Sequence, residues 1–285
     1  MSLKPSISCE FFPPKTEKGF ANLTAVRQQL NAINPSYYSV TFGAGGTTQD
    51  YTLEAIKNIQ AESATTGVEA APHISCVGTT ERIISDLIST YKTLGIKRLV
   101  ALRGDQPSGM QTFGDFRYAS ELVAFIRQTT GNHFTIEVAA YPEQHPQASS
   151  AQADLDHFKR KVDAGADSAI TQYFYNIDAY RYFIDRCQQN NIAIPITPGI
   201  MPINNFIQLA RFSDNCGAEI PRWLRKRLEE FHDDTASLQA FTLDFLTDFT
   251  QQLIELDVPG LHFYTMNKTD PVLTVCQRLG LSSKK

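Results

Sequence analysis

Short apolar runs alternate with longer segments whose apolar side chains recur at helical spacing along almost the whole chain. The short runs predict strands, and the longer segments predict amphipathic helices. Strands are expected at residues 6–12, 37–42, 69–76, 99–102, 134–140, 167–174, 192–197 and 260–265. Helices are expected at residues 22–33, 48–66, 81–94, 118–130, 149–164 and 178–189, in a long region 204–256 interrupted at 220–221, and in a last segment ending at 279.

Capping residues and prolines refine some of these boundaries. Ser149 with Gln152 is expected to form a capping box at the start of one helix, and Asp178 is expected to cap the next. Pro72 and Pro195 fall inside two predicted strands and weaken both predictions, because proline cannot donate to a ladder of hydrogen bonds.

The order of the elements predicts an α/β fold, a closed (β/α)8 barrel of the TIM type with extra helices between the seventh and eighth strands. Several successive strands begin about 30 residues apart, which is the length of one strand–helix unit. No linker or change in composition divides the chain, so residues 1–285 are interpreted as a single domain. An open, doubly wound sheet is the alternative. Against it, no Gly-x-Gly-x-x-Gly follows the first strand, and the glycine-rich run at 43–46 is incomplete.

Composition narrows the class of protein. The chain has 285 residues, of which 42% are hydrophobic and 20% are charged, with a net charge of −4. These values are typical of a soluble globular protein and argue against nucleic acid as the main partner. No stretch has the length of a membrane span, and the five scattered cysteines suggest reduced thiols in the cytoplasm. The six histidines lack metal-binding spacing, so no metal site is expected.

Polar and aromatic residues end several predicted strands, at the edge where α/β barrels bind ligands. Arg103-Gly104-Asp105 follows the fourth strand, and Pro107 stops that strand from continuing. An Arg–Asp pair in an ordinary surface turn is the alternative interpretation. The other strand ends supply mostly neutral hydrogen-bonding groups and rings, which indicates a large planar ligand: Glu10, Thr41, Phe42, His73, Tyr141, Gln172, His262 and Tyr264.

Glu10 is the candidate general acid. It lies between Cys9 and Phe11, and burial in an apolar setting is expected to raise the pKa of its carboxyl group. A structural carboxylate in an ion pair below the rim of the barrel is the alternative.

A second cluster follows the fifth strand. Tyr141 and His145 precede a helix whose start contains Asp154 and whose later turns carry Lys159-Arg160-Lys161. A helix N-terminus with nearby cations suits a phosphate or diphosphate group. The alternative is a solvated basic face of the helix.

These residues give the chain a family resemblance. It resembles methylenetetrahydrofolate reductase, a flavin-dependent barrel enzyme of one-carbon metabolism. The matching segments follow the same order over nearly the whole chain: Glu10-Phe-Phe-Pro-Pro14, Ser39-Val-Thr-Phe-Gly-Ala44, Glu69-Ala-Ala-Pro-His73, Ala101-Leu-Arg-Gly-Asp105, Ala139-Ala-Tyr-Pro-Glu143, Ser150-Ala-Gln-Ala-Asp-Leu155, Lys159-Arg-Lys-Val-Asp-Ala-Gly-Ala166, Ile170-Thr-Gln172, Pro198-Gly-Ile-Met-Pro202 and His262-Phe-Tyr-Thr265.

The resemblance implies reduction of 5,10-methylenetetrahydrofolate to 5-methyltetrahydrofolate, which supplies methyl groups for methionine synthesis. NADH or NADPH would reduce a non-covalent FAD, and that substrate would leave before the folate binds. Glu10 would donate the proton that opens the methylene bridge, and Asp105 would lie between flavin and pterin. Gln172 and Lys268 would contact folate, and Phe206 would stack on folate or nicotinamide. The implied flavin-binding positions are Thr41, Phe42, Ala44, His73, Arg103, Gly104, Asp105, Tyr118, Tyr141, His145, Ala148, Asp154, Arg160 and Lys161.

The chain departs from the family pattern at two of these places. His157 replaces a common asparagine near the flavin diphosphate, and Lys268 replaces a common arginine near the folate. The resemblance also implies a homo-oligomer.

Two other functions stay open. A flavin-independent lyase or aldolase would need a Schiff-base lysine at a strand end, and no lysine occurs there. A non-catalytic flavin-binding protein is disfavoured by the set Glu10, Asp105 and Gln172.

Overall fold

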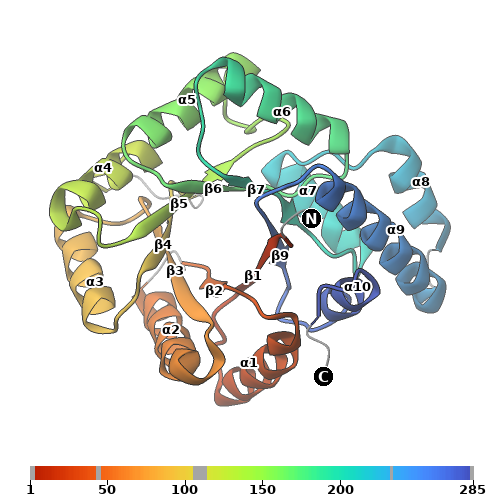
Figure 1. The fold of residues 1–285 in the computed structure, drawn as a ribbon, viewed down its shortest axis with the longest axis horizontal. Helices are drawn as coiled ribbons and strands as arrows, with labels where there is room; N and C mark the ends of the chain where they lie inside the picture. The colour runs from red at the N-terminus through yellow and green to blue at the C-terminus, as the bar shows by residue number, and fades with distance from the viewer. Residues whose placement is uncertain (1–3, 43–45, 105–113, 232–233, 283–285) are drawn as a thin grey trace.

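The computed structural model describes residues 4–42, 46–104, 114–231 and 234–282, and within them parallel strands form a ring surrounded by helices (Figure 1). The strands are β1 (Ser6–Phe11), β2 (Tyr37–Val40), β3 (Glu69–Ser75), β4 (Arg98–Leu102), β5 (Thr135–Ala140), β6 (Ser168–Thr171), β7 (Ile196–Thr197), β8 (Gly199–Ile200) and β9 (Gly260–Tyr264). The predicted barrel of the TIM type is confirmed.

The ring is closed by two short strands on either side of Pro198. β7 pairs with β6, β8 pairs with β9, and the His262 amide donates to the Pro198 carbonyl over 3.0 Å. Pro198 has no N–H group, so the ladder is interrupted there and two short strands occupy the seventh strand position. The seventh strand was predicted at 192–197 and lies instead at 196–200, directly after Pro195. Pro72, by contrast, stays within β3.

Helices follow the strands around the outside of the ring. They are α1 (Glu17–Leu30), η1 (Asn31–Ile33), α2 (Gly46–Thr66), α3 (Glu81–Thr93), α4 (Ala119–Thr130), α5 (Ala151–Asp163), α6 (Ile177–Gln189), α7 (Phe206–Cys216), α8 (Arg222–Phe231), α9 (Thr235–Glu255) and α10 (Val272–Arg278). The predicted extra helices between the last two strand positions are α7, α8 and α9. None of the helices within the described ranges is long and apolar enough to cross a membrane.

Two helix caps differ from the prediction. Ser150, and not Ser149, caps α5, because its extended backbone lets the hydroxyl oxygen accept from the Ala153 amide at 3.1 Å. Asn176, and not Asp178, caps α6, and its side chain accepts from the Asp178 amide at 3.0 Å. In both cases a neighbouring polar residue was the better-placed acceptor.

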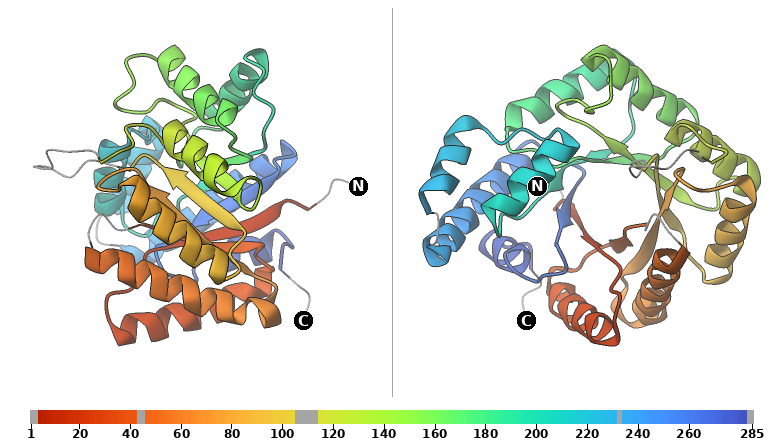
Figure 2. Two further views of the ribbon diagram at one scale, coloured as in Figure 1. Left: turned by 90° about the vertical axis from the view of Figure 1, so that its left-hand side faces the viewer. Right: turned by 180° about the vertical axis from the view of Figure 1, so that it is seen from behind.

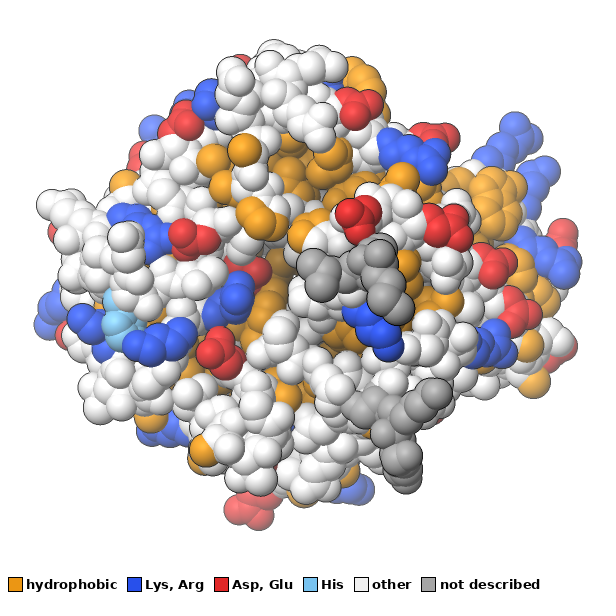
Figure 3. Space-filling view, in the orientation of Figure 1, with side chains coloured by type: hydrophobic (Ala, Val, Ile, Leu, Met, Phe, Trp, Pro, Cys, Tyr) orange, Lys and Arg blue, Asp and Glu red, His pale blue; other side chains and the backbone are white. Residues whose placement is uncertain are grey.

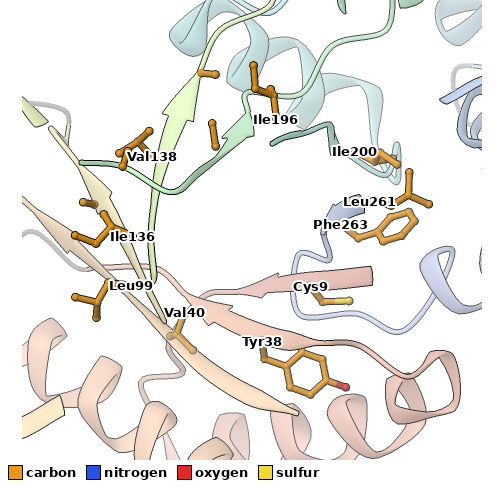
Figure 4. Packing of buried hydrophobic residues seen from close by; sticks show 14 of the residues in the cluster. Cys9, Tyr38, Val40, Leu99, Ile136, Val138, Ile196, Ile200, Leu261 and Phe263 are labelled. Carbon is orange, nitrogen blue, oxygen red and sulfur yellow. The ribbon is translucent and has the colours of Figure 1, made fainter. Parts of the chain in front are cut away.

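The hydrophobic core lies between the strands and the surrounding helices. Side chains such as Cys9, Tyr38, Val138 and Phe263 point out of the ring into this layer (Figure 4). Alternate residues of the same strands point the other way, into the barrel. That interior is polar, and its buried members include Ser8, Ser39, His73, Glu137 and His262.

The two ends of the barrel differ. β1 begins and α10 ends at the side of the amino ends of the strands, whereas α7 and α8 lie towards the opposite side (Figure 2). Residues that end strands therefore gather at one open end, as the barrel prediction requires.

Candidate active site

Glu10 lies inside the barrel between two histidines. Its Oε2 atom is 3.4 Å from His73 Nε2 on β3 and 3.6 Å from His262 Nε2 on β9. Both imidazoles are almost fully buried, while the Glu10 side chain keeps 15% of its surface exposed. Neither Nε2 atom has a hydrogen-bond partner within the described part of the chain, so both are available to this carboxylate or to a ligand.

The setting of Glu10 differs from the one expected from its neighbours in sequence. Cys9 and Phe11 are fully buried in the outer core, and strand alternation turns Glu10 away from them. Burial raises the pKa of the Glu10 carboxyl, but the facing imidazoles of His73 and His262 outweigh it and the pKa lies below its ordinary value. The expected increase is therefore wrong in direction, because the strand presents Glu10 to polar neighbours.

A serine fixes one of the two histidines. The Ser8 hydroxyl lies 2.8 Å from His262 Nδ1, so the Nε2 atom of the same ring is left facing Glu10. Burial lowers the pKa of His73, with Glu10 acting in the opposite direction. Glu10 and the two imidazoles thus form one unit of interacting titratable groups.

Tyr264 connects this unit to the end of β6. Its hydroxyl donates to the Thr171 carbonyl at 2.8 Å, and its ring lies 5.2 Å from that of His262 and 6.4 Å from that of Tyr173. Burial raises the pKa of Tyr264, and the nearby Glu10 and Tyr141 groups raise it further. These three side chains therefore share one region of the barrel.

A cationic cluster borders the same end of the barrel. Lys161 on α5 donates to the Ala139 carbonyl over 2.5 Å, and Arg103 bonds to Gln147. Burial lowers the pKa of Lys161 to about 8, with Asp154 opposing and Arg103 reinforcing the change. Asp154 accepts from the His145 amide at 2.8 Å and thereby holds the loop before α5.

The charge balance of this cluster fits a diphosphate. Arg160, which bonds to His157 at 2.8 Å, adds a third cation to Arg103 and Lys161. Asp154, in the first turn of α5, is the acid that acts on Lys161, whereas Arg160 and Lys161 lie in the last turn, so the cluster carries excess positive charge. A dinucleotide with two phosphates would supply the missing negative charge.

Aromatic rings flank the cluster. The Tyr141 and His145 rings lie 4.6 Å apart, and the Tyr118 ring stacks on His157 at 5.5 Å. His157, the departure from the family pattern, therefore packs against a predicted flavin residue. Thr41 and Phe42, both half-buried, follow β2, and the half-buried Ala148 donates its amide to the His145 carbonyl.

Gly104 makes the turn after β4. Its φ angle is +79°, and a Cβ atom there would lie 2.1 Å from the Ser75 hydroxyl oxygen. Glycine is required by both the left-handed backbone and the close approach of β3. The turn sets Arg103 at the rim.

Two of the three predicted substrate residues, Lys268 and Gln172, lie at separate hollows. A hollow of about 450 Å³, open to solvent, has Lys268 in its lining, together with Met201, Pro202, Asn204, Asn205, Gln208, Leu209, Phe212 and Met266. Gln172 lines a smaller hollow of about 170 Å³ with Tyr141, Glu143, Tyr173 and Cys216. Phe206 begins α7 directly after Asn205 and lines neither hollow.

Two predicted residues, Ala44 and Asp105, lie outside the described residues. Among the described residues, no group of three or more His, Cys, Asp and Glu could hold a metal ion. Ser8 was missed as a site residue, and His262 was noted only as a strand end. The period of two that places Ser8 and Glu10 on one face of β1 was the signal that could have revealed Ser8.

The comparisons with known proteins agree with each other. A family model described as methylenetetrahydrofolate reductase matches residues 2–280. The 5,10-methylenetetrahydrofolate reductase of Escherichia coli (strain K12) is 39% identical over 276 residues, which is 97% of this chain and 91% of that protein. A probable methylenetetrahydrofolate reductase (NADH) of Oryza sativa subsp. japonica is 38% identical over 287 residues, 96% of this chain and 48% of that protein.

A solved structure shows the same fold. It is described as an uncharacterized protein from Clostridium thermocellum that binds two copies of 5-methyl-5,6,7,8-tetrahydrofolic acid. Its TM-score is 0.66 at 16% sequence identity, covering 98% of this chain and 96% of that one.

Proposed function

The chain belongs to the methylenetetrahydrofolate reductase family, and from that premise we propose that it reduces 5,10-methylenetetrahydrofolate to 5-methyltetrahydrofolate. The reductant is a nicotinamide dinucleotide, NADH or NADPH, and the electron carrier is a non-covalent FAD. The arrangement of Glu10 between His73 and His262 is the observation that carries the proposal, because it holds a titratable carboxyl group at the open end of a barrel.

Glu10 acts as the proton donor to the folate nitrogen. An amine nitrogen is a poor leaving group until it is protonated, so opening the methylene bridge needs an acid. The imidazoles keep the pKa of the Glu10 carboxyl low in the free protein. A folate over the site would exclude water from the carboxyl group, which raises its pKa and favours the protonated form. His262, with Ser8 on its Nδ1 atom, presents Nε2 to Glu10 and helps to orient that carboxyl group.

The cationic cluster holds the cofactor. Arg103, Arg160 and Lys161 bind its diphosphate, while Tyr118 and Tyr141 supply rings beside it. The remaining positions of the implied cofactor site are Thr41, Phe42, Ala44, His73, Gly104, Asp105, His145, Ala148 and Asp154. Bound FAD supplies hydride transfer from the nicotinamide to the folate.

The nicotinamide and the folate use the same open end in turn. Phe206 at the start of α7 stacks on whichever substrate is bound, and Gln172 and Lys268 contact the folate. Asp105 would lie between flavin and pterin, and for that residue the proposal rests on the family resemblance alone. The same resemblance supports a homo-oligomer that supplies methyl groups for methionine synthesis, and the five scattered cysteines favour the cytoplasm.

Anaerobic half-reactions test the proposal. The purified protein should be yellow and should release its flavin to the supernatant on acid precipitation. NADH and NADPH, added separately without oxygen, should bleach the flavin absorbance at rates that identify the preferred reductant. Methylenetetrahydrofolate should then restore the absorbance and yield 5-methyltetrahydrofolate. A colourless protein that does not bind added FAD, or a reduced protein that methylenetetrahydrofolate fails to reoxidise, would contradict the proposal.

A further inference from the structure

An ion pair with a buried carboxylate lies inside the barrel towards the amino ends of the strands. Arg98 Nη1 on β4 is 3.1 Å from Glu137 Oε1 on β5, and the Glu137 side chain is only 4% exposed against 25% for Arg98. Figure 3 shows this side of the molecule, where hydrophobic side chains are visible around the centre and charged side chains are scattered over the surface. The active-site proposal uses neither Arg98 nor Glu137.

The Glu137 carboxylate is held by three donors. Besides Arg98, the Tyr37 hydroxyl donates to Oε2 at 2.6 Å and the Ser168 hydroxyl donates to Oε1 at 3.0 Å. Barrel interiors of this kind are usually filled by branched apolar side chains. A buried ion pair is seldom more stabilising than well-packed apolar residues of similar volume. Stability alone therefore does not account for a charge at this place.

Tyr37 connects this pair to the candidate active site. Its ring lies 4.6 Å from the Arg98 guanidinium carbon and stacks on the His262 ring, with centroids 6.2 Å apart and an interplanar angle of 29°. The strand register keeps the contact in place, because Ser8 on β1 pairs with Tyr37 on one side and with His262 on the other. The hydroxyl end of Tyr37 is thus fixed by Glu137 and its ring packs against His262.

We propose that Glu137, held by Arg98, is a positioning residue that fixes His262 against Glu10 through the ring of Tyr37. His262 is in contact with Ser8 at Nδ1, with Tyr37 at its face and with Glu10 beyond Nε2. Ser8 sets which nitrogen points at the carboxylate, and Tyr37 sets the plane of the ring. The inference rests on the proposed role of Glu10 as proton donor.

Loosening Tyr37 should then affect one half-reaction and not the other. Proton donation depends on the geometry of Glu10 and His262, whereas hydride transfer from the nicotinamide to the flavin does not use them. Displacements of about 1 Å can cost on the order of 10²-fold in rate. A partial loosening is expected to cost about tenfold.

The test uses a graded series of variants in the FAD-bound protein. Tyr37→Phe removes the bond to Glu137 and keeps the ring, Tyr37→Leu removes both, and Glu137→Gln removes the buried charge. Glu62→Gln is the matched control, because Glu62 also pairs with a buried arginine, Arg27 at 2.8 Å, but between α1 and α2 outside the barrel. Glu10→Gln is measured in parallel.

Stopped-flow absorbance gives the first readout. Reoxidation by methylenetetrahydrofolate should slow about tenfold in Tyr37→Leu and by less in Tyr37→Phe and Glu137→Gln. Flavin reduction by the nicotinamide should stay within about twofold in all three, since it does not use this geometry. Glu62→Gln should leave both rates unchanged. Equal slowing of both half-reactions would overturn the inference in favour of a merely structural role.

Ring NMR signals of ¹⁵N-labelled histidines give the second readout. The His262 signals should move in all three variants. The signals of His157 should not move, because this residue lies on α5 and its ring stacks on Tyr118, with centroids 5.5 Å apart. Unmoved His262 signals in Tyr37→Leu would refute the positioning role even if Glu10→Gln abolishes reoxidation. If Glu10→Gln reoxidises normally, the proposed role of Glu10 as proton donor fails, while the His262 signals still decide whether Tyr37 positions that ring.

Discussion

Glu10 on β1 and His262 on β9 face each other across neighbouring strands, with 3.6 Å between Glu10 Oε2 and His262 Nε2. The two strands come from opposite ends of the chain and are adjacent because the barrel closes. The candidate acid therefore takes its electrostatic environment from a residue that only closure brings near.

Glu10→Gln should separate the two half-reactions. Glutamine has no acidic proton to transfer at this position, so reoxidation of the reduced flavin by methylenetetrahydrofolate should slow by at least about 10²-fold. Reduction by the nicotinamide should remain within a few-fold of normal, because it needs no acid at the folate nitrogen. Stopped-flow absorbance resolves both steps. If neither step slows, Glu10 is a structural carboxylate and the proton has another source.

FAD affinity should depend on the protonation of Lys161. Burial lowers the pKa of Lys161 to about 8, so its positive charge is present below that pH and is lost above it in the free protein. FAD binding should therefore weaken as pH rises above 8, by up to about tenfold per pH unit until the pKa of the bound state is reached. Flavin fluorescence titrations measure the affinity. Lys161→Arg, which stays charged, should bind FAD equally well over this range.

Glu143 should make the folded protein less stable as pH rises. A carboxylate in an ion pair has the opposite effect, because its pKa is lowered and not raised. Burial raises its pKa from 4.5 to about 6, although the Glu219 amide donates to it at 2.7 Å. The folded state then binds more protons than the unfolded state between these values, so the free energy of unfolding falls as pH rises through them. In Glu143→Gln this decrease should be absent. The free energy of unfolding of the variant should therefore rise relative to that of the natural protein between pH 4.5 and 6. Urea unfolding across this range tests it, and parallel curves for both proteins would count against it.

Asn205→Ala should weaken the start of α7. The Asn205 side chain accepts from the Gln208 amide at 2.9 Å, and losing such a cap typically costs about 1 kcal/mol in the free energy of unfolding. Because Phe206 follows directly, the KM of a substrate that stacks on it should rise. Asn205→Asp should restore both values, as aspartate is an equally good cap. Normal stability together with a raised KM would show that Asn205 binds substrate directly.

Much of the fold follows from local pattern. Alternation of short apolar runs with helical segments gave the order of strands and helices, because each element must bury one face against the next layer. The errors fell where local signals compete: two polar neighbours could cap α5 or α6, and two prolines flank or divide the strand that closes the ring. At a helix start with two polar candidates, the residue that caps the helix is the one whose backbone conformation lets its side chain accept the capping hydrogen bond.

The sequence by itself also determined that Ser8 and Glu10 share one face of β1, because side chains alternate along a strand. Only the tertiary structure decided what that face meets. Ser8 contacts His262 across 254 positions of sequence, and Tyr37 reaches Glu137 across 100. The direction of the pKa change at Glu10 followed from such neighbours and not from Cys9 and Phe11. Electrostatic effects act over a few ångströms in space, and closure of the barrel sets which groups come within that distance.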